Sequence, residues 1–70
     1  MLKMIEIFVN GERVQAPVDA SVSGLLKLLK IAPDRVAVEL NKTLIRKRDW
    51  DATPIPSGAY LEVVEFVGGG

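Results

Sequence analysis

Apolar and polar residues alternate along the first part of the chain with a period of two, the spacing of a strand that buries one face. The apolar positions of this pattern are Ile5, Ile7 and Val9, and later Val14 and Ala16. Between the two groups lies Asn10-Gly11, a dipeptide that accepts the positive φ angles of a type I′ turn. Residues 4–17 are therefore predicted to form a β-hairpin.

The spacing of apolar residues then changes from two to that of a helix. Ser21 can accept a hydrogen bond from a free backbone N–H of the first helical turn. The aliphatic residues that follow recur on one helical face: Val22, Leu25, Leu26 and Leu29. We expect this face to pack on a sheet and Pro33 to mark the end of the helix.

Alternation with a period of two returns in the second half of the chain. Residues 36–40 predict a third strand that stops at Asn41-Lys42, and residues 43–45 could add a short fourth. Residues 46–59 combine prolines with clustered charges, so they are expected to form an irregular surface connection that Trp50 anchors. Residues 60–67 are predicted to form the last strand, with Leu61 and Val63 facing inward and Glu62 outward.

This order of elements predicts an α+β fold in which one main helix crosses a mixed five-strand sheet. In the β-grasp arrangement, which has this order, the first and last strands lie side by side and parallel in the middle of the sheet. A chain of 70 residues supports a single core. We therefore expect one domain over residues 1–67, followed by a flexible glycine tail at residues 68–70.

Composition excludes most kinds of active site. The chain contains neither Cys nor His, so thiol nucleophiles, imidazole bases and zinc sites built on these residues are ruled out. Nine basic and nine acidic residues cancel, which argues against nucleic acid or an anionic membrane as a partner. No secretory signal is recognisable in residues 1–9, and we expect a cytoplasmic protein that is not an enzyme.

Several segments together resemble the ThiS family, the ubiquitin-like sulfur carriers of thiamine biosynthesis and relatives of the molybdopterin synthase small subunit. The resemblance covers the whole chain and rests on the order and spacing of short motifs. These are Asn10-Gly11-Glu12, Ser21-Val22, Leu25-Leu26, Val36-Ala37-Val38-Glu39-Leu40-Asn41, Trp50 and Val67-Gly68-Gly69-Gly70.

The resemblance implies that the chemistry takes place at the carboxylate of Gly70. In the family, a partner enzyme uses ATP to adenylate this carboxylate, and a sulfur donor, expected to be a persulfide, converts it to a thiocarboxylate. Gly68 and Gly69 would thread into the partner's active site, where a Cβ would collide with the walls. The implied partners are an adenylating enzyme and a thiazole synthase, and the carrier itself is expected to bind no cofactor and no metal.

Phe66 and Val67 are predicted to dock a partner, because an apolar pair beyond the last inward positions of the strand has little core left to join. The alternative is that they simply continue the core strand. Residues 68–70 could likewise be only a frayed end. The charged run 46–48 is expected to be a solvated turn, because three basic residues beside Asp49 and Asp51 are too few to indicate RNA binding.

Three other functions remain compatible with the sequence. A molybdopterin-synthase-type subunit would share the tail but form a stable complex with a larger catalytic subunit. A ubiquitin-like modifier would form isopeptide bonds with lysine side chains. A plain β-grasp interaction module would work without its tail, because a fold alone does not confer chemistry.

Overall fold

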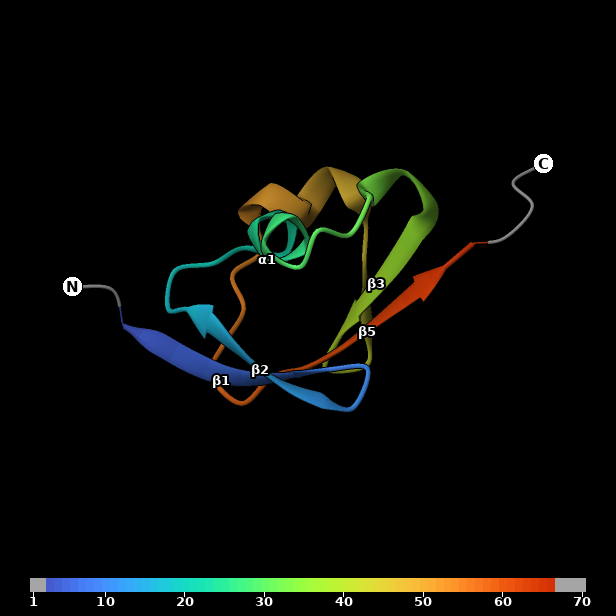
Figure 1. Cartoon of the computed structure of the whole chain (residues 1–70). Coiled ribbons are helices and arrows are strands. Elements are labelled where there is room, and N and C mark those ends of the chain that lie inside the picture. The colour runs from blue at the N-terminus through green and yellow to red at the C-terminus, as the bar shows by residue number, and fades with distance from the viewer. Residues whose placement is uncertain (1–2, 67–70) are drawn as a thin grey trace.

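The computed structural model describes residues 3–66, which form five strands and one α-helix in the predicted order (Figure 1). The elements are β1 (Met4–Val9), β2 (Glu12–Pro17), α1 (Val22–Leu28), β3 (Val36–Leu40), β4 (Thr43–Ile45) and β5 (Tyr60–Glu65). Two short 3-10 helices accompany them, at Pro33–Arg35 and Lys47–Ala52.

The five strands form one sheet in the order β2-β1-β5-β3-β4, with α1 across one face (Figure 1). β1 and β5 are parallel neighbours in the middle of the sheet, whereas β1 with β2, β3 with β4 and β3 with β5 are antiparallel. The predicted α+β fold, with a mixed five-strand sheet, one main helix and β-grasp topology, is therefore confirmed.

Both hairpins turn through two residues with positive φ, and each turn begins with an asparagine. The φ angles are 51° at Asn10 and 83° at Gly11, the values that a type I′ turn requires. At Asn41 and Lys42 they are 50° and 70°. Asparagine tolerates this left-handed region better than most residues, which explains its place at both turns.

The two turn asparagines also attach β5 to its neighbours. The Oδ1 atom of Asn10 accepts a hydrogen bond from the Val63 amide at 2.8 Å, and its Nδ2 donates to the Val63 carbonyl at 3.2 Å. Asn41 Oδ1 accepts from the Tyr60 amide at 2.9 Å. Each side chain thus pairs with β5 as a further strand residue would.

Helix α1 begins as predicted and ends earlier than predicted. Ser21 Oγ accepts a hydrogen bond from the Gly24 amide at 3.1 Å, so the expected N-cap is confirmed. The helix ends at Leu28 because Lys30 takes a left-handed φ of 59° and the Ile31 amide bonds the Leu26 carbonyl at 2.9 Å, a Schellman ending. The expectation that Pro33 ends the helix is wrong, since Pro33 instead opens a 3-10 helix.

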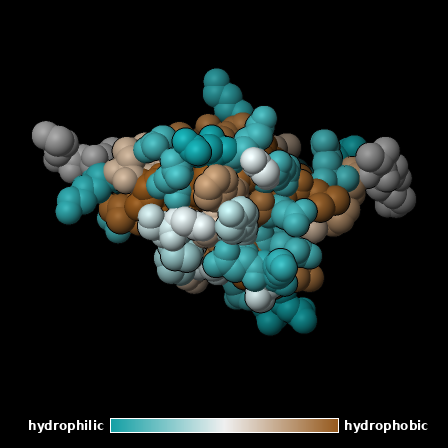
Figure 2. Space-filling model, turned by 90° about the horizontal axis from the view of Figure 1, so that it is seen from below, coloured by the Kyte–Doolittle hydropathy of each residue, from teal (hydrophilic) through white to brown (hydrophobic). Residues whose placement is uncertain are grey.

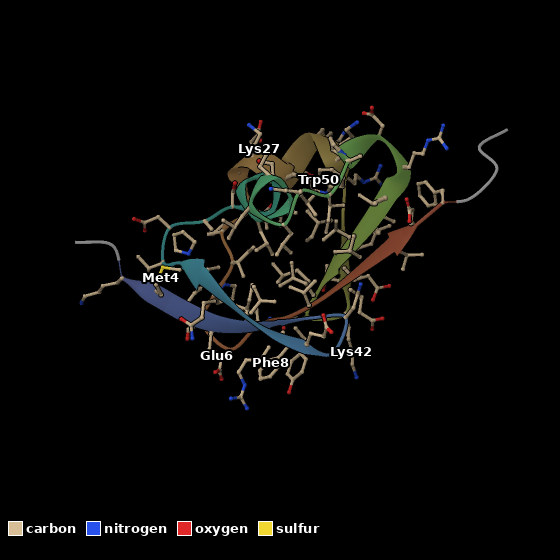
Figure 3. All side chains as sticks on the ribbon, viewed as in Figure 1. Met4, Glu6, Phe8, Lys27, Lys42 and Trp50 are labelled. Carbon is tan, nitrogen blue, oxygen red and sulfur yellow. The ribbon has the colours of Figure 1, made fainter. Side chains whose placement is uncertain are left out.

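The core lies between the sheet and α1. Its largest fully buried side chains are Ile7, Val22, Leu25, Leu26, Val38, Ile55 and Leu61. Trp50, on the 3-10 helix Lys47–Ala52, lies beside α1 and is only 3% exposed (Figure 3). Its Nε1–H donates to the Ile45 carbonyl at 3.0 Å, which confirms it as an anchor.

The connection between β4 and β5 is more ordered than the sequence suggested. It contains the 3-10 helix Lys47–Ala52, and it places Ile55 and Ala59 in the core. The Val22 amide donates to the Thr53 carbonyl at 3.0 Å, so this connection is tied to the start of α1. The predicted surface location is confirmed for most of this connection, whereas the prediction that it is irregular is wrong over the 3-10 helix Lys47–Ala52.

The predicted last strand and the tail are described only in part. β5 ends at Glu65, whereas the predicted strand ran over residues 60–67. Val67, the expected domain boundary after it and the glycine tail at residues 68–70 lie outside the described residues. Among residues 3–66, no helix has the length and apolar character needed to cross a membrane.

Replacing Asn10 by Gly tests the attachment of β5. Glycine accepts the positive φ of the turn but removes both hydrogen bonds to Val63, each worth about 0.5–1.5 kcal/mol. We expect the free energy of unfolding to fall by about 1–2 kcal/mol and the midpoint of thermal unfolding to fall by at least about 4 °C. Circular dichroism during heating measures this.

Lys42→Gly is the matched control. Lys42 also has a positive φ, but its side chain makes no hydrogen bond to β5. We expect this variant to be as stable as the wild-type protein or slightly more stable. Equal losses of stability in the two variants would contradict the role given to the Asn10 side chain.

Candidate functional site

The predicted site begins where β5 leaves the sheet. β3 pairs with β5 from Leu61 to Glu65, and the Phe66 amide adds a further hydrogen bond to the Arg35 carbonyl at 2.6 Å. On its other side β5 is paired with β1 only through Tyr60 and Leu61. β5 therefore extends past the end of β1, and it points toward the C-terminal end of the chain (Figure 1).

Of the predicted site residues, the structure describes Phe66 alone. Its side chain is 53% exposed, although its backbone is held to β3. Leu61, five positions earlier on β5, is 1% exposed. The position of Phe66 is thus that of an apolar side chain on the surface beside the start of the tail. Val67, Gly68, Gly69 and Gly70 lie outside the described residues.

The outer face of the sheet carries an apolar surface that the sequence reasoning did not single out. Its exposed or half-exposed side chains are Phe8, Leu44, Tyr60 and Val64. The rings of Phe8 and Tyr60 stack with centroids 4.8 Å apart, and Phe8 points away from α1 (Figure 3). The signal was present in the sequence, because residues 60, 62 and 64 share the outward phase of the last strand.

Acidic side chains lie within this outer face. Glu39 on β3 and Glu62 on β5 are directly opposite each other in the register of the two strands. Neither forms a salt bridge within residues 3–66, whereas Glu6 pairs with Arg13 at 3.3 Å. Like charges directly opposite each other on adjacent strands destabilise a sheet, so this pair makes the outer face locally acidic at some cost in stability.

Figure 2 shows the same outer face as a mixed surface. Hydrophilic residues surround smaller hydrophobic and pale patches on this face. This mixture does not by itself set the outer face apart as a binding surface, because interfaces that form reversibly are about as apolar as the rest of a protein surface.

The described side chains offer little of their own for catalysis. The chain has no Cys or His, and within residues 3–66 no group of three or more acidic side chains could hold a metal ion. The burial pattern leaves no polar side chain of this region in the core.

Comparison with known proteins agrees with this description. The ThiS family model matches residues 3–70. A crystal structure of the thiamine biosynthesis protein ThiS from Geobacter metallireducens superposes with a TM-score of 0.82 at 33% identity, covering 94% of this chain and all of that one. An NMR structure of a thiamine biosynthesis protein from the same organism gives 0.75 at 35% identity, covering 94% of this chain and 88% of that one.

Two sequence relatives differ greatly in length. A thiazole synthase of Magnetococcus marinus is 38% identical over 66 residues, which are 94% of this chain and 20% of that protein. The chain thus spans a fifth of the length of that relative. An uncharacterised protein, ycf40, of Porphyra purpurea is 35% identical over 97% of this chain and 96% of its own length. Because the family model covers nearly the whole sequence, the chain belongs to the ThiS family, the sulfur carriers of thiamine biosynthesis.

Proposed function

We propose that this carrier transports sulfur as a thiocarboxylate on Gly70 and delivers it for thiazole formation. The observation that supports the proposal most is the match of the family model through residue 70, on a chain whose central strand runs toward Gly68-Gly69-Gly70. As a ThiS-family carrier the protein is not an enzyme, so each chemical step takes place in the active site of a partner.

The proposed chemistry starts from activation of the Gly70 carboxylate. A carboxylate is ionised at neutral pH and is a poor electrophile. In the adenylating enzyme its oxygen attacks the α-phosphorus of ATP, pyrophosphate leaves, and an acyl-adenylate forms. The terminal sulfur of a persulfide then attacks the acyl carbon, and AMP leaves. A thiol cleaves the remaining S–S bond and releases the thiocarboxylate together with a disulfide.

The length of chain after β5 limits where the partner's active site can lie. Five residues, 66–70, follow the last strand residue. A fully extended chain advances at most about 3.3–3.6 Å per residue, so Gly70 can reach no more than about 18 Å from Glu65. We infer that Gly68 and Gly69 thread a narrow channel that leads to the partner's active site, since they lack side chains. Phe66 and Val67 would dock on the partner at the entrance of this channel.

The proposed partners are an adenylating enzyme, a persulfide donor and a thiazole synthase. The Magnetococcus marinus relative supports the last of these, because a segment similar to this chain is part of a protein that is itself a thiazole synthase. The ATP belongs to the adenylating enzyme, and the carrier binds no cofactor of its own. We place these reactions in the cytoplasm.

Intact-mass measurement tests the site of sulfur attachment. The carrier ending at Gly70 is incubated with ATP, the adenylating enzyme of the same organism and a persulfide donor. We expect a mass increase equal to the replacement of one oxygen atom by sulfur. A variant with one alanine added after Gly70 should gain no sulfur, because its reactive carbonyl would lie one residue too far along the chain and would carry a Cβ. Sulfur on the untrimmed variant would refute the proposed mechanism.

Phe66→Ala tests the docking role of the residue before the tail. A half-exposed aromatic contributes little to folding, whereas loss of an interfacial aromatic costs about 1–2 kcal/mol of binding when it is a hot spot. We expect the affinity for the adenylating enzyme to fall by about five- to thirtyfold while the unfolding midpoint moves by less than about 3 °C.

Leu61→Ala is the matched comparison on the same strand. Leu61 is buried, so its truncation should cost about 2–5 kcal/mol of folding free energy. For both variants, calorimetric unfolding measures the loss of folding stability, and titration with the adenylating enzyme measures the loss of affinity. If the two variants lost the same folding stability, Phe66 would be a core residue and the docking role would be mistaken.

A further inference from the structure

Within residues 3–66, no strand pairs with one edge of β5 over the last part of that strand. β1 pairs with β5 only at Phe8–Tyr60 and Val9–Leu61, because β1 then turns at Asn10. β5 continues to Glu65 with β3 on its other side. Beyond Leu61, in the place that β1 would occupy in a longer sheet, the side chain of Asn10 bonds both backbone groups of Val63.

The hydrogen bonds show which backbone groups face this edge. The Tyr60 carbonyl accepts a hydrogen bond from the Asn41 amide at 2.7 Å, and the Phe66 amide donates to the Arg35 carbonyl at 2.6 Å. The backbone N–H and C=O groups of the even-numbered residues of β5 therefore point toward β3. Backbone groups of an antiparallel pair alternate in direction, so Glu65 points its N–H and C=O toward the β1 side. No residue of the described range 3–66 pairs with them there.

Grooves run along both faces of this edge. The groove on the outer face has a volume of about 730 Å³ and includes Glu39, Tyr60 and Glu62. The groove on the α1 side has a volume of about 440 Å³ and includes Ile31 and Val36. Asn10, Val63 and Glu65 line both grooves. Side chains of an added strand would alternate between the two faces, and each face has space for them.

We propose that this edge binds an extended segment of the adenylating enzyme by strand addition. The segment lies in line with β1 beyond Asn10 and hydrogen-bonds to the Glu65 backbone. The inference rests on the proposed function, since it assigns to the adenylating partner a surface next to the tail. Backbone pairing at Glu65 would fix the distance from the partner to Gly70 and so help to place the tail in its active site.

The charges and the apolar lining define the chemistry of the added segment. Glu39, Glu62 and Glu65 line the outer groove with Lys42 as its one basic residue, so basic side chains fit this face. The inner groove is lined by the apolar residues Ile31, Ala32 and Val36 and by the charged residues Lys30 and Glu65, so that face fits small side chains that are either apolar or able to pair with these two charges. A second copy of the chain fits poorly, because pairing of two β5 edges would bring acidic side chains of both copies together.

Amide hydrogen exchange of the ¹⁵N-labelled carrier, free and bound to the adenylating enzyme, tests the proposal. Exchange proceeds in the complex, is quenched, and is measured on the released carrier. We expect the Glu65 amide to exchange quickly in the free protein and at least about tenfold more slowly in the complex. The Val64 amide, which faces β3, is the internal control and should be protected in both states.

Unchanged exchange at Glu65 in a complex that still loads sulfur onto Gly70 would overturn the strand addition and leave the proposed function intact. Protection of Glu65 without any mass increase, in the presence of ATP and the donor, would support the edge and contradict the proposed function. Protection that grows with carrier concentration in the absence of enzyme would identify a second copy as the occupant and overturn the proposed one.

Variants at the same position add a binding measurement. Glu65→Pro removes the N–H that faces the free edge but no hydrogen bond to β3, and Glu65→Ala removes the carboxylate and keeps the N–H. We expect Glu65→Pro to bind the adenylating enzyme about tenfold more weakly than Glu65→Ala. Equal affinities of the two variants, with unfolding midpoints that match, would count against backbone pairing at this residue.

Discussion

The position of β5 between β1 and β3 is the constraint on which the rest of the structure depends. β5 joins the hairpin β1–β2 to the hairpin β3–β4, because it lies between β1 and β3 in the sheet and the two hairpins do not pair with each other directly. The hydrogen bonds of Asn10 with Val63 link residues that are 53 positions apart. Such non-local pairing has to overcome the entropy of closing a long loop, so we regard completion of the sheet by β5 as the step that unites the domain.

β5 contributes to both the buried core and the exposed outer face of the sheet. Its inward-facing residues, of which Leu61 is the most deeply buried, complete the core under α1. Its outward-facing residues Tyr60, Glu62 and Val64 form part of the outer face. A chain of this size has few residues to spare beyond its core. The chemistry proposed at Gly70 places few demands on such a domain, because the folded part would have only to hold β5 in place and to offer a surface to each proposed partner.

Local charge matters more here than net charge. The formal net charge is zero, yet Glu39 and Glu62 lie opposite each other on the outer face. The basic run at residues 46–48 lies at the start of the 3-10 helix Lys47–Ala52, with Arg46 as its N-cap. Lys47 contacts Asp34 at 3.4 Å in an exposed ion pair, the kind that contributes little to stability. A net charge of zero thus excludes a strong overall electrostatic field, but it is compatible with a locally acidic surface on the outer face.

Sequence alone determined the elements whose signals are local. The period-two alternation, the Asn-Gly turn and the serine cap predicted β1, β2 and the start of α1, because each depends on residues a few positions apart. The motifs along the chain also predicted the family, and the order of elements predicted the fold. Phe66 was expected on the surface because the inward phase of β5 ends before it, and its side chain is indeed half exposed.

Only the tertiary structure decided the features that depend on distant neighbours. The burial of Ile55 and Ala59 could not be derived from a segment rich in proline and charge, since it depends on residues distant in the sequence. The same is true of the 3-10 helix around Trp50, which packs against α1. The Schellman ending at Lys30 replaced the expected stop at Pro33, because a lysine gives no local sign of a left-handed conformation. The opposition of Glu39 and Glu62 and the free edge at Glu65 follow from strand register and from where β1 ends, which the three-dimensional pairing alone determines.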